Sequence, residues 1–174
     1  MKKRGNLSKR GQVKGQLKLS FGMIFSIILI IIFFIFAFFA IKSFMGIKNS
    51  AETGKFINDL ETDIDRVWKS AQSSQQKEYF IPSGVDAVCF TDFEISAKGA
   101  NRERYDELKR SFYGSENLIF YPFGSSDLDS TIVENIDLAE ITKDENPFCL
   151  ENQEGKINLV LKKDFGEILV KITR

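Results

Sequence analysis

The two cysteines of this 174-residue chain, Cys89 and Cys149, are the residues best suited to chemistry. Their separation fits no CxxC redox motif, and two cysteines cannot make a four-cysteine zinc or iron–sulfur site. The chain has no histidine, so a cysteine nucleophile would lack its usual activating base. In an oxidising compartment the pair predicts one disulfide, and two unrelated buried thiols are the alternative.

Carboxylates gather in residues 126–131, where Asp127, Asp129 and Thr131 copy the spacing at the start of a calcium-binding loop. The segment lacks the loop glycine, and Leu138 occupies the position of the bidentate glutamate. A solvated acidic loop is therefore the better interpretation. The sequence also contains no nucleophile elbow, SxxK, HExxH or phosphate-binding glycine loop. We expect a protein that is not an enzyme and that has no metal site and no cofactor.

An apolar segment from Phe21 to Ile41 precedes all of these candidate residues in the chain. Its 21 residues carry no charge, and as a helix they would span about 30 Å, the thickness of a bilayer's hydrocarbon core. A secretory signal peptide has a shorter apolar region and ends in small residues, whereas Ile41 and Lys42 follow the last alanine here. The segment predicts a transmembrane helix, with the lipid bilayer as a partner.

Charge is distributed very unevenly around this segment. Residues 1–20 hold seven basic and no acidic side chains, whereas residues 42–174 hold 17 basic and all 24 acidic ones, a net charge of −7. The positive-inside rule predicts a single-pass protein of the cell membrane with a cytoplasmic N-terminus and an external C-terminal domain. The basic tail suits the anionic lipids of the inner leaflet, and the negative external region would repel nucleic acid, so we expect no nucleic-acid partner.

The basic tail runs into the apolar segment through Lys14-Gly15-Gln16-Leu17-Lys18-Leu19-Ser20, and Arg10-Gly11-Gln12 is an earlier copy of the same tripeptide type. This resembles the class III signal peptide of archaeal-type type IV pilins and archaellins. In that family a peptidase cuts after the glycine, and the apolar helix stays on the mature protein.

The resemblance implies that Lys14, Gly15 and Gln16 form the processing site. It also implies a pilin-type signal peptidase and other pilin-like subunits as partners. The implied function is that of a pilin-like subunit or accessory component of a surface filament or secretion assembly. Ser20 stands where the family usually carries glutamate. The alternative is an uncleaved anchor that holds a non-polymerising binding or structural module of the cell envelope.

Apolar residues continue beyond Ile41 at intervals of three and four, which is one face of a helix. The positions are Phe44, Ile47, Ala51, Phe56, Ile57, Leu60, Ile64, Val67, Trp68 and Ala71. We predict a nearly continuous helix over residues 19–74, with a bend allowed at Gly46 or Gly54. Its first half would lie in lipid. The apolar stripe of its second half would cover the core of a globular head, and a partner-binding surface is the alternative for this stripe.

The remaining residues predict short strands and one short helix. Strands are expected over 78–81, 85–93, 117–123 and 148–150, a helix over 101–113, and either state over 132–142. A hairpin of 156–162 and 167–173 ends the chain, with Ile168, Val170 and Ile172 facing inward. The fold class is therefore α+β. We divide the chain into a basic tail (1–20), a transmembrane helix (21–41), an amphipathic helical extension (42–76) and an α+β head (77–174).

Overall fold

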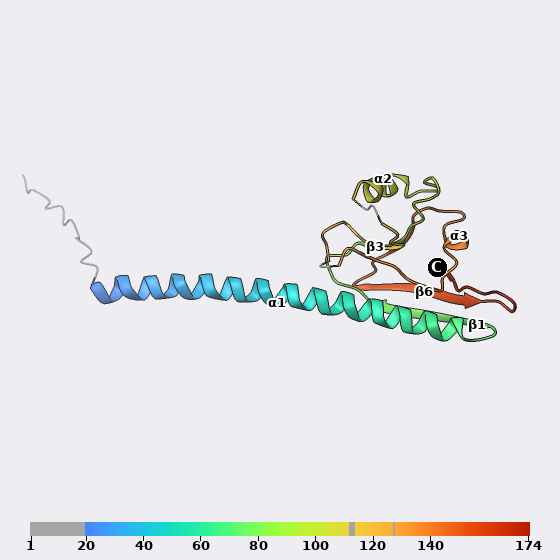
Figure 1. Cartoon of the computed structure of the whole chain (residues 1–174). Helices are drawn as coiled ribbons and strands as arrows, with labels where there is room; N and C mark the ends of the chain where they lie inside the picture. The colour runs from blue at the N-terminus through green and yellow to red at the C-terminus, as the bar shows by residue number, and fades with distance from the viewer. Residues whose placement is uncertain (1–19, 112–113, 127) are drawn as a thin grey trace, which may run out of the picture. The chain divides into compact units, whose positions relative to one another are not determined.

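The computed structural model describes residues 20–111, 114–126 and 128–174, and it has the predicted α+β fold, a long N-terminal helix followed by small antiparallel sheets (Figure 1). The described residues divide into two units, one that ends at Lys42 and one that begins at Ser43. The helices are α1 (Phe21–Trp68), α2 (Arg102–Ser111) and α3 (Leu138–Ile141). The strands are β1 (Ser73–Phe80), β2 (Ala87–Phe90), β3 (Leu118–Tyr121), β4 (Ser130–Thr131), β5 (Phe148–Glu151), β6 (Lys156–Lys163) and β7 (Lys171–Thr173).

Helix α1 confirms the prediction of one continuous helix, because it passes Gly46 and Gly54 without interruption. The predicted end of this helix at residue 74 is wrong. The helix ends at Trp68, and residues 73–76, which we assigned to the helical extension, begin strand β1. Ser73 pairs with Lys163 at the far end of β6. Pairing along the whole length of β6 outweighs the weak strand preference of serine and glutamine.

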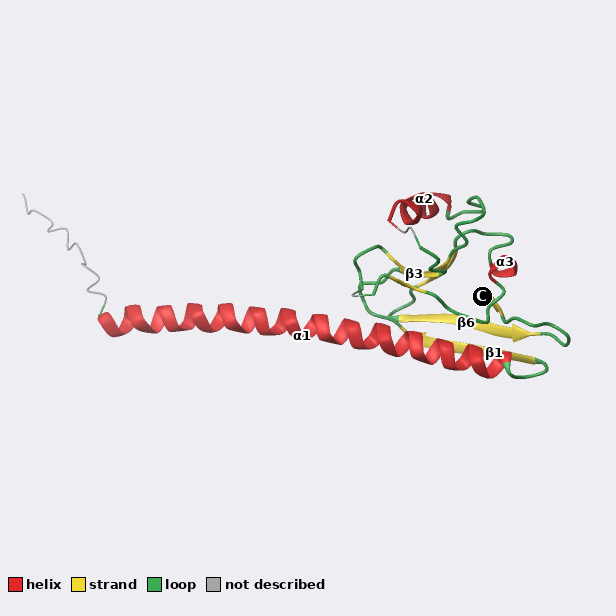
Figure 2. Cartoon of the chain, in the orientation of Figure 1, coloured by secondary structure: helices red, strands yellow, loops and turns green. Residues whose placement is uncertain are grey.

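Two antiparallel sheets build the head, a three-stranded sheet in the order β1-β6-β7 and a four-stranded sheet in the order β4-β3-β2-β5 (Figure 2). The predicted terminal hairpin is confirmed, since Leu161 of β6 lies opposite Ile172 of β7. Val170 and Ile172 are buried as expected, but Ile168 is 78% exposed. That prediction fails because β7 begins only at Lys171, so the alternation of a strand does not extend back to residue 168.

The main core lies between α1 and the two sheets. Helix α1 buries Thr53, Phe56, Leu60, Ile64 and Val67, whose spacing of three and four residues places them on one helix face. The ring of Phe56 lies 5.6 Å from the rings of both Tyr79 in β1 and Phe120 in β3, measured between centroids. Phe56 therefore joins the helix to both sheets. In Figure 1 the C-terminal part of α1 runs alongside β1 and β6.

A second, smaller core lies beneath α2. Strand β2 directs Val88 and Phe90 into the main core, whereas Ala87 and Cys89 join Leu108 of α2 in the second one. The predicted strand over residues 85–93 is confirmed in its centre, although β2 covers only Ala87–Phe90. Because each face of β2 meets a separate core, all four of its residues are buried.

The sequence allowed either a helix or a strand over residues 132–142. The structure has the short helix α3 there. The side chain of Asp137 accepts a hydrogen bond from the backbone of Glu140, at 3.0 Å, and caps the start of this helix. Asp137 also donates its backbone N–H to Val170, at 2.8 Å. These contacts attach α3 to the residues that precede β7.

Candidate functional site

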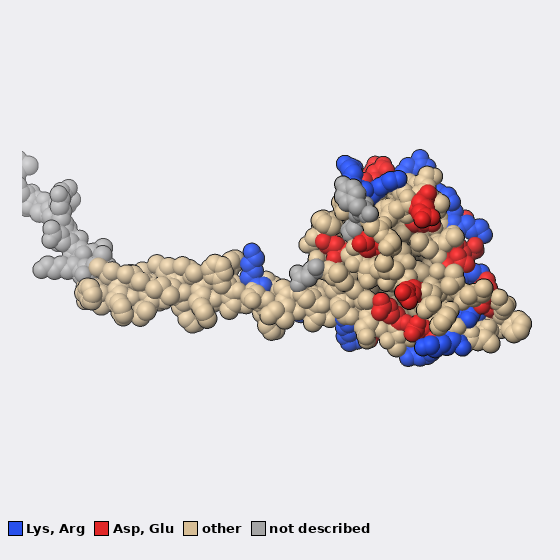
Figure 3. All heavy atoms as spheres, viewed as in Figure 1, with Lys and Arg blue, Asp and Glu red and all other residues tan. Residues whose placement is uncertain are grey.

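The N-terminal part of α1 exposes an uncharged apolar surface. The large apolar side chains from Phe21 to Ile41 are between 44% and 85% exposed, and Figure 3 shows this part of the helix with a continuous surface of neither acidic nor basic atoms. The hydroxyl of Ser26 donates to the carbonyl of Gly22, at 2.9 Å, so this polar group is satisfied inside the helix. Such a surface requires apolar surroundings. The helix is long and apolar enough to cross a membrane.

The helix begins directly after Ser20, whose carbonyl accepts hydrogen bonds from Met23, at 2.9 Å, and Ile24, at 3.2 Å. The first turn of α1 contains no acidic residue. Lys14, Gly15 and Gln16 lie outside the described residues, so the processing site stays a prediction.

The exposed apolar surface continues past the predicted span. Phe44, Met45 and Ile47 are 70%, 53% and 66% exposed. The second half of the predicted helix was expected to cover the head, but burial on α1 begins only at Thr53, so Ile47 is exposed. The apolar residues of α1 after the predicted span keep one helical periodicity, but only those from Phe56 onward pack against the sheets.

A buried pair of hydroxyls joins α1 to the head. Thr53 donates to the carbonyl of Asn49, at 3.0 Å, so Ser126 donates to Thr53 Oγ1, at 2.7 Å. Asp129 accepts a hydrogen bond from the backbone of Gly124, at 2.8 Å. The described residues of the calcium-like segment therefore organise a turn, and Ser126 is buried rather than solvated. Within the described part of the chain, no group of three or more acidic or cysteine side chains could hold a metal ion.

An ionic cluster centred on Asp63 joins α1 to β1. The carboxylate accepts hydrogen bonds from Lys77 and from the hydroxyl of Tyr79, both at 3.0 Å, and from Arg66. Burial raises the pKa of Asp63, but the three hydrogen bonds outweigh it and hold this pKa below its ordinary value. Burial and the neighbouring carboxylate together raise the pKa of Tyr79 well above its ordinary value. The cluster is thus charged on Asp63 and neutral on Tyr79 at physiological pH.

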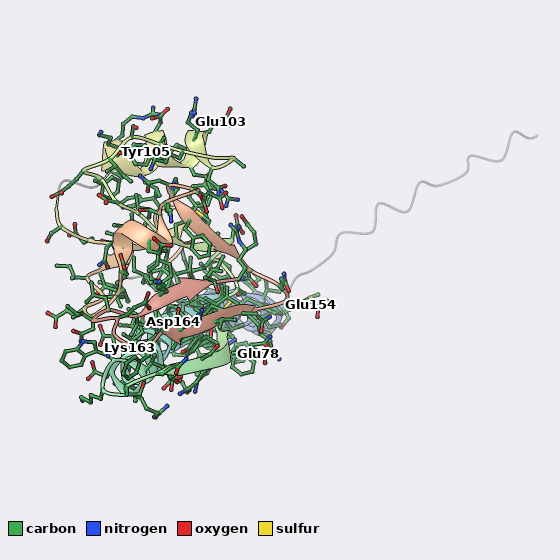
Figure 4. All side chains as sticks on the ribbon, turned by 90° about the vertical axis from the view of Figure 1, so that its right-hand side faces the viewer. Glu78, Glu103, Tyr105, Glu154, Lys163 and Asp164 are labelled. Atoms are coloured by element: carbon green, nitrogen blue, oxygen red, sulfur yellow. A yellow bond between two sulfur atoms is a disulfide. The ribbon has the colours of Figure 1, made fainter. Side chains whose placement is uncertain are left out.

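Lys163 caps the C-terminal end of α1. This side chain is only 8% exposed, and its ammonium donates to the carbonyls of Trp68 and Ser70, the latter at 3.1 Å. A cation at a helix C-terminus satisfies free carbonyls and opposes the negative end of the helix dipole. Figure 4 labels Lys163 beside Asp164 at the end of β6. We placed Lys163 in a turn, although the alternation of Ile157, Leu159 and Leu161 predicts an inward position for residue 163.

The predicted disulfide is present. Cys89 and Cys149 are bonded and lie directly opposite each other on the adjacent strands β2 and β5. Both are completely buried in the core beneath α2. The bond therefore links two strands that the backbone already pairs, and it closes a loop of 60 residues.

Comparison with known proteins identifies no relative of this chain. No protein-family model matches it, and neither the curated proteins nor the solved structures include a significant match. Its function has to be inferred from the contacts, charges and exposed surfaces of its own residues.

Proposed function

We propose that this protein is a single-pass membrane protein with an external head, and that it acts as a pilin-like subunit or accessory component of a surface filament or secretion assembly. One observation carries the proposal. A single uninterrupted helix, α1, exposes an uncharged surface over Phe21–Ile41 and then buries Phe56, Leu60 and Ile64 against the two sheets. One helix would therefore supply both the membrane anchor and, farther along the chain, part of the core of the head.

The distribution of charge and the disulfide support an external head. Seven basic side chains precede the span, and the region after it has a net charge of −7. The buried bond between Cys89 and Cys149 suits an oxidising compartment outside the cytoplasm. Protease added to intact cells should then digest the head. Protection of the head until the cells are lysed would contradict this orientation.

The exposed residues Phe44, Met45 and Ile47 support assembly with other subunits. They lie three to six residues past Ile41, or up to about 9 Å along the helix beyond the roughly 30 Å that a bilayer requires, and Lys42 separates them in sequence from the uncharged span. Contact between the helices of neighbouring subunits would cover this surface. The leader-like sequence Lys14-Gly15-Gln16 points to the same class of assembly.

Chemical cross-linking tests the assembly. In native membranes, a bismaleimide should join pairs of Phe44→Cys chains into covalent dimers, because Phe44 would lie at a helix–helix contact and Cys89 and Cys149 leave each chain with a single free thiol. Glu103→Cys, on the exposed face of α2, is the matched control and should remain monomeric. A Phe44→Cys chain that cross-links no more than the control would argue against assembly through α1.

A non-polymerising anchored module of the cell envelope is the second candidate. The observation that favours it is the start of α1, where Ser20 replaces the glutamate of the pilin family and the first turn contains no acidic residue. Absence of cross-links together with an external head would support this candidate.

A further inference from the structure

Two turns meet at one end of the head, one from α1 to β1 and one from β6 to β7 (Figure 1). The ammonium of Lys163 joins them, because it donates to the carbonyls of Trp68 and Ser70, the latter at 3.1 Å. We call residues 68–72 and 162–171, which form these turns, the tip of the head.

The tip exposes large apolar side chains. Phe165 and Ile168 are 83% and 78% exposed, and within the described part of residues 43–174 no large apolar side chain is more exposed than these two. Leu169 and Trp68 are 38% and 36% exposed. Phe165 occupies the corner of a tight turn, which the backbone N–H of Glu167 closes by donating to the carbonyl of Asp164, at 3.1 Å. The apolar surface of the tip is therefore convex.

The tip is positively charged, although the head as a whole is negative. It carries four basic and two acidic side chains, a net charge of +2, whereas the rest of residues 43–174 carries 12 basic and 22 acidic side chains, a net charge of −10. The side chains of Lys69 and Lys162 are 67% and 46% exposed, and each has a carboxylate neighbour at the surface, a weak interaction in water. An anionic surface would attract the tip and repel the rest of the head.

The size of the tip distinguishes between kinds of partner. A stable protein interface covers about 800 Å² and roughly 20–30 residues on each side, whereas the tip presents four exposed apolar side chains on two turns. Shallow insertion into a bilayer requires only a small apolar surface with basic side chains beside it. Aromatic side chains such as Trp68 and Phe165 suit the boundary between lipid and water. The tip therefore fits a lipid surface better than it fits a second copy of the chain.

We propose that the tip inserts Phe165, Ile168 and Leu169 into the surface of an anionic lipid bilayer other than the one that holds the span. The exposed lysines of the tip would contact the lipid phosphates. The helix rises about 38 Å from Ser43, where the unit that contains the head begins, to Trp68. This rise is several times the roughly 5–10 Å depth of such an insertion, which is why the proposal specifies a separate bilayer. The contact requires the anchor and the head but not assembly through α1.

The fluorescence of Trp68, the chain's single tryptophan, tests the proposal. The full chain is reconstituted in phosphatidylcholine vesicles, and vesicles of brominated phosphatidylglycerol are then added. They should quench Trp68, and unbrominated ones should shift its emission to shorter wavelength. Phe165→Ser and Ile168→Ser should each weaken vesicle binding about tenfold, because each removes an apolar side chain that lipid would bury. Phe80→Ser is the matched control, at a 65% exposed position outside the tip, and should leave binding unchanged.

The source of the brominated lipid separates the outcomes. Brominated lipid in the vesicles that hold the protein should not quench Trp68. Three results would overturn the proposal: added vesicles do not quench Trp68, brominated phosphatidylcholine quenches it as strongly as the anionic lipid, or Phe80→Ser weakens binding as much as Phe165→Ser does. Association of the reconstituted vesicles with one another, lost in Phe165→Ser, would overturn it as well and identify a second copy of the chain as the partner.

Discussion

Removing the ammonium of Lys163 should detach the end of α1 from the sheet beside it. Lys163→Met keeps the apolar stem but leaves the carbonyls of Trp68 and Ser70 without their charged donor. Hydrogen bonds to charged groups contribute roughly 1.5–3 kcal/mol each, and part of this is offset because a buried ammonium no longer has to be desolvated. We therefore expect the free energy of unfolding to fall by about 2–4 kcal/mol.

Lys162→Met is the matched control for this substitution. Lys162 lies one residue away, but its side chain is 46% exposed and pairs with Asp164, at 2.9 Å, on the surface. Exposed ion pairs contribute roughly 0.2–1 kcal/mol, so this variant should change stability very little. Urea unfolding of the full chain in detergent measures both variants through the fluorescence of Trp68, the chain's single tryptophan. A difference between the two variants below about 0.5 kcal/mol would refute the capping role of Lys163.

Three further predictions concern the head. Phe56→Ala should destabilise the head by about 3–5 kcal/mol in urea unfolding, whereas Phe165→Ala, at an 83% exposed position, should not. Because the pKa of Asp63 is lowered by folding, its stabilisation is complete above the unfolded value of 3.8 and is lost as the pH falls through the folded value. Stability should therefore decline below about pH 4, and Asp63→Asn should flatten that decline. Reduction of the Cys89–Cys149 bond should cost about 4 kcal/mol of stability by loop entropy, and two thiols alkylated without reduction in native protein would contradict the bond.

The sequence was most informative where one physical requirement acts over many residues. The uncharged run from Phe21 to Ile41 and the spacing of Phe56, Leu60 and Ile64 each predict a helix, because apolar surface has to be buried in lipid or in protein. The terminal hairpin was predictable from strict alternation along β6. The disulfide was predictable because the chain offers only one pair of cysteines.

Features that depend on contacts between distant segments could not be predicted. Ser73 begins a strand only because Lys163 lies opposite it, 90 residues later in the chain. Phe44 and Ile47 share the periodicity of Phe56, but no pattern within the helix shows where the sheets begin to cover it.

The mass of the N-terminus of native protein tests the central proposal most directly. A pilin-like protein should begin at Gln16, and Gly15→Leu should leave a precursor about 15 residues heavier, because the peptidase accepts no side chain before the cut. Gly11→Leu is the matched control and should not change the mature mass. A wild-type protein that retains Met1 would contradict the pilin-like function and favour the uncleaved anchor.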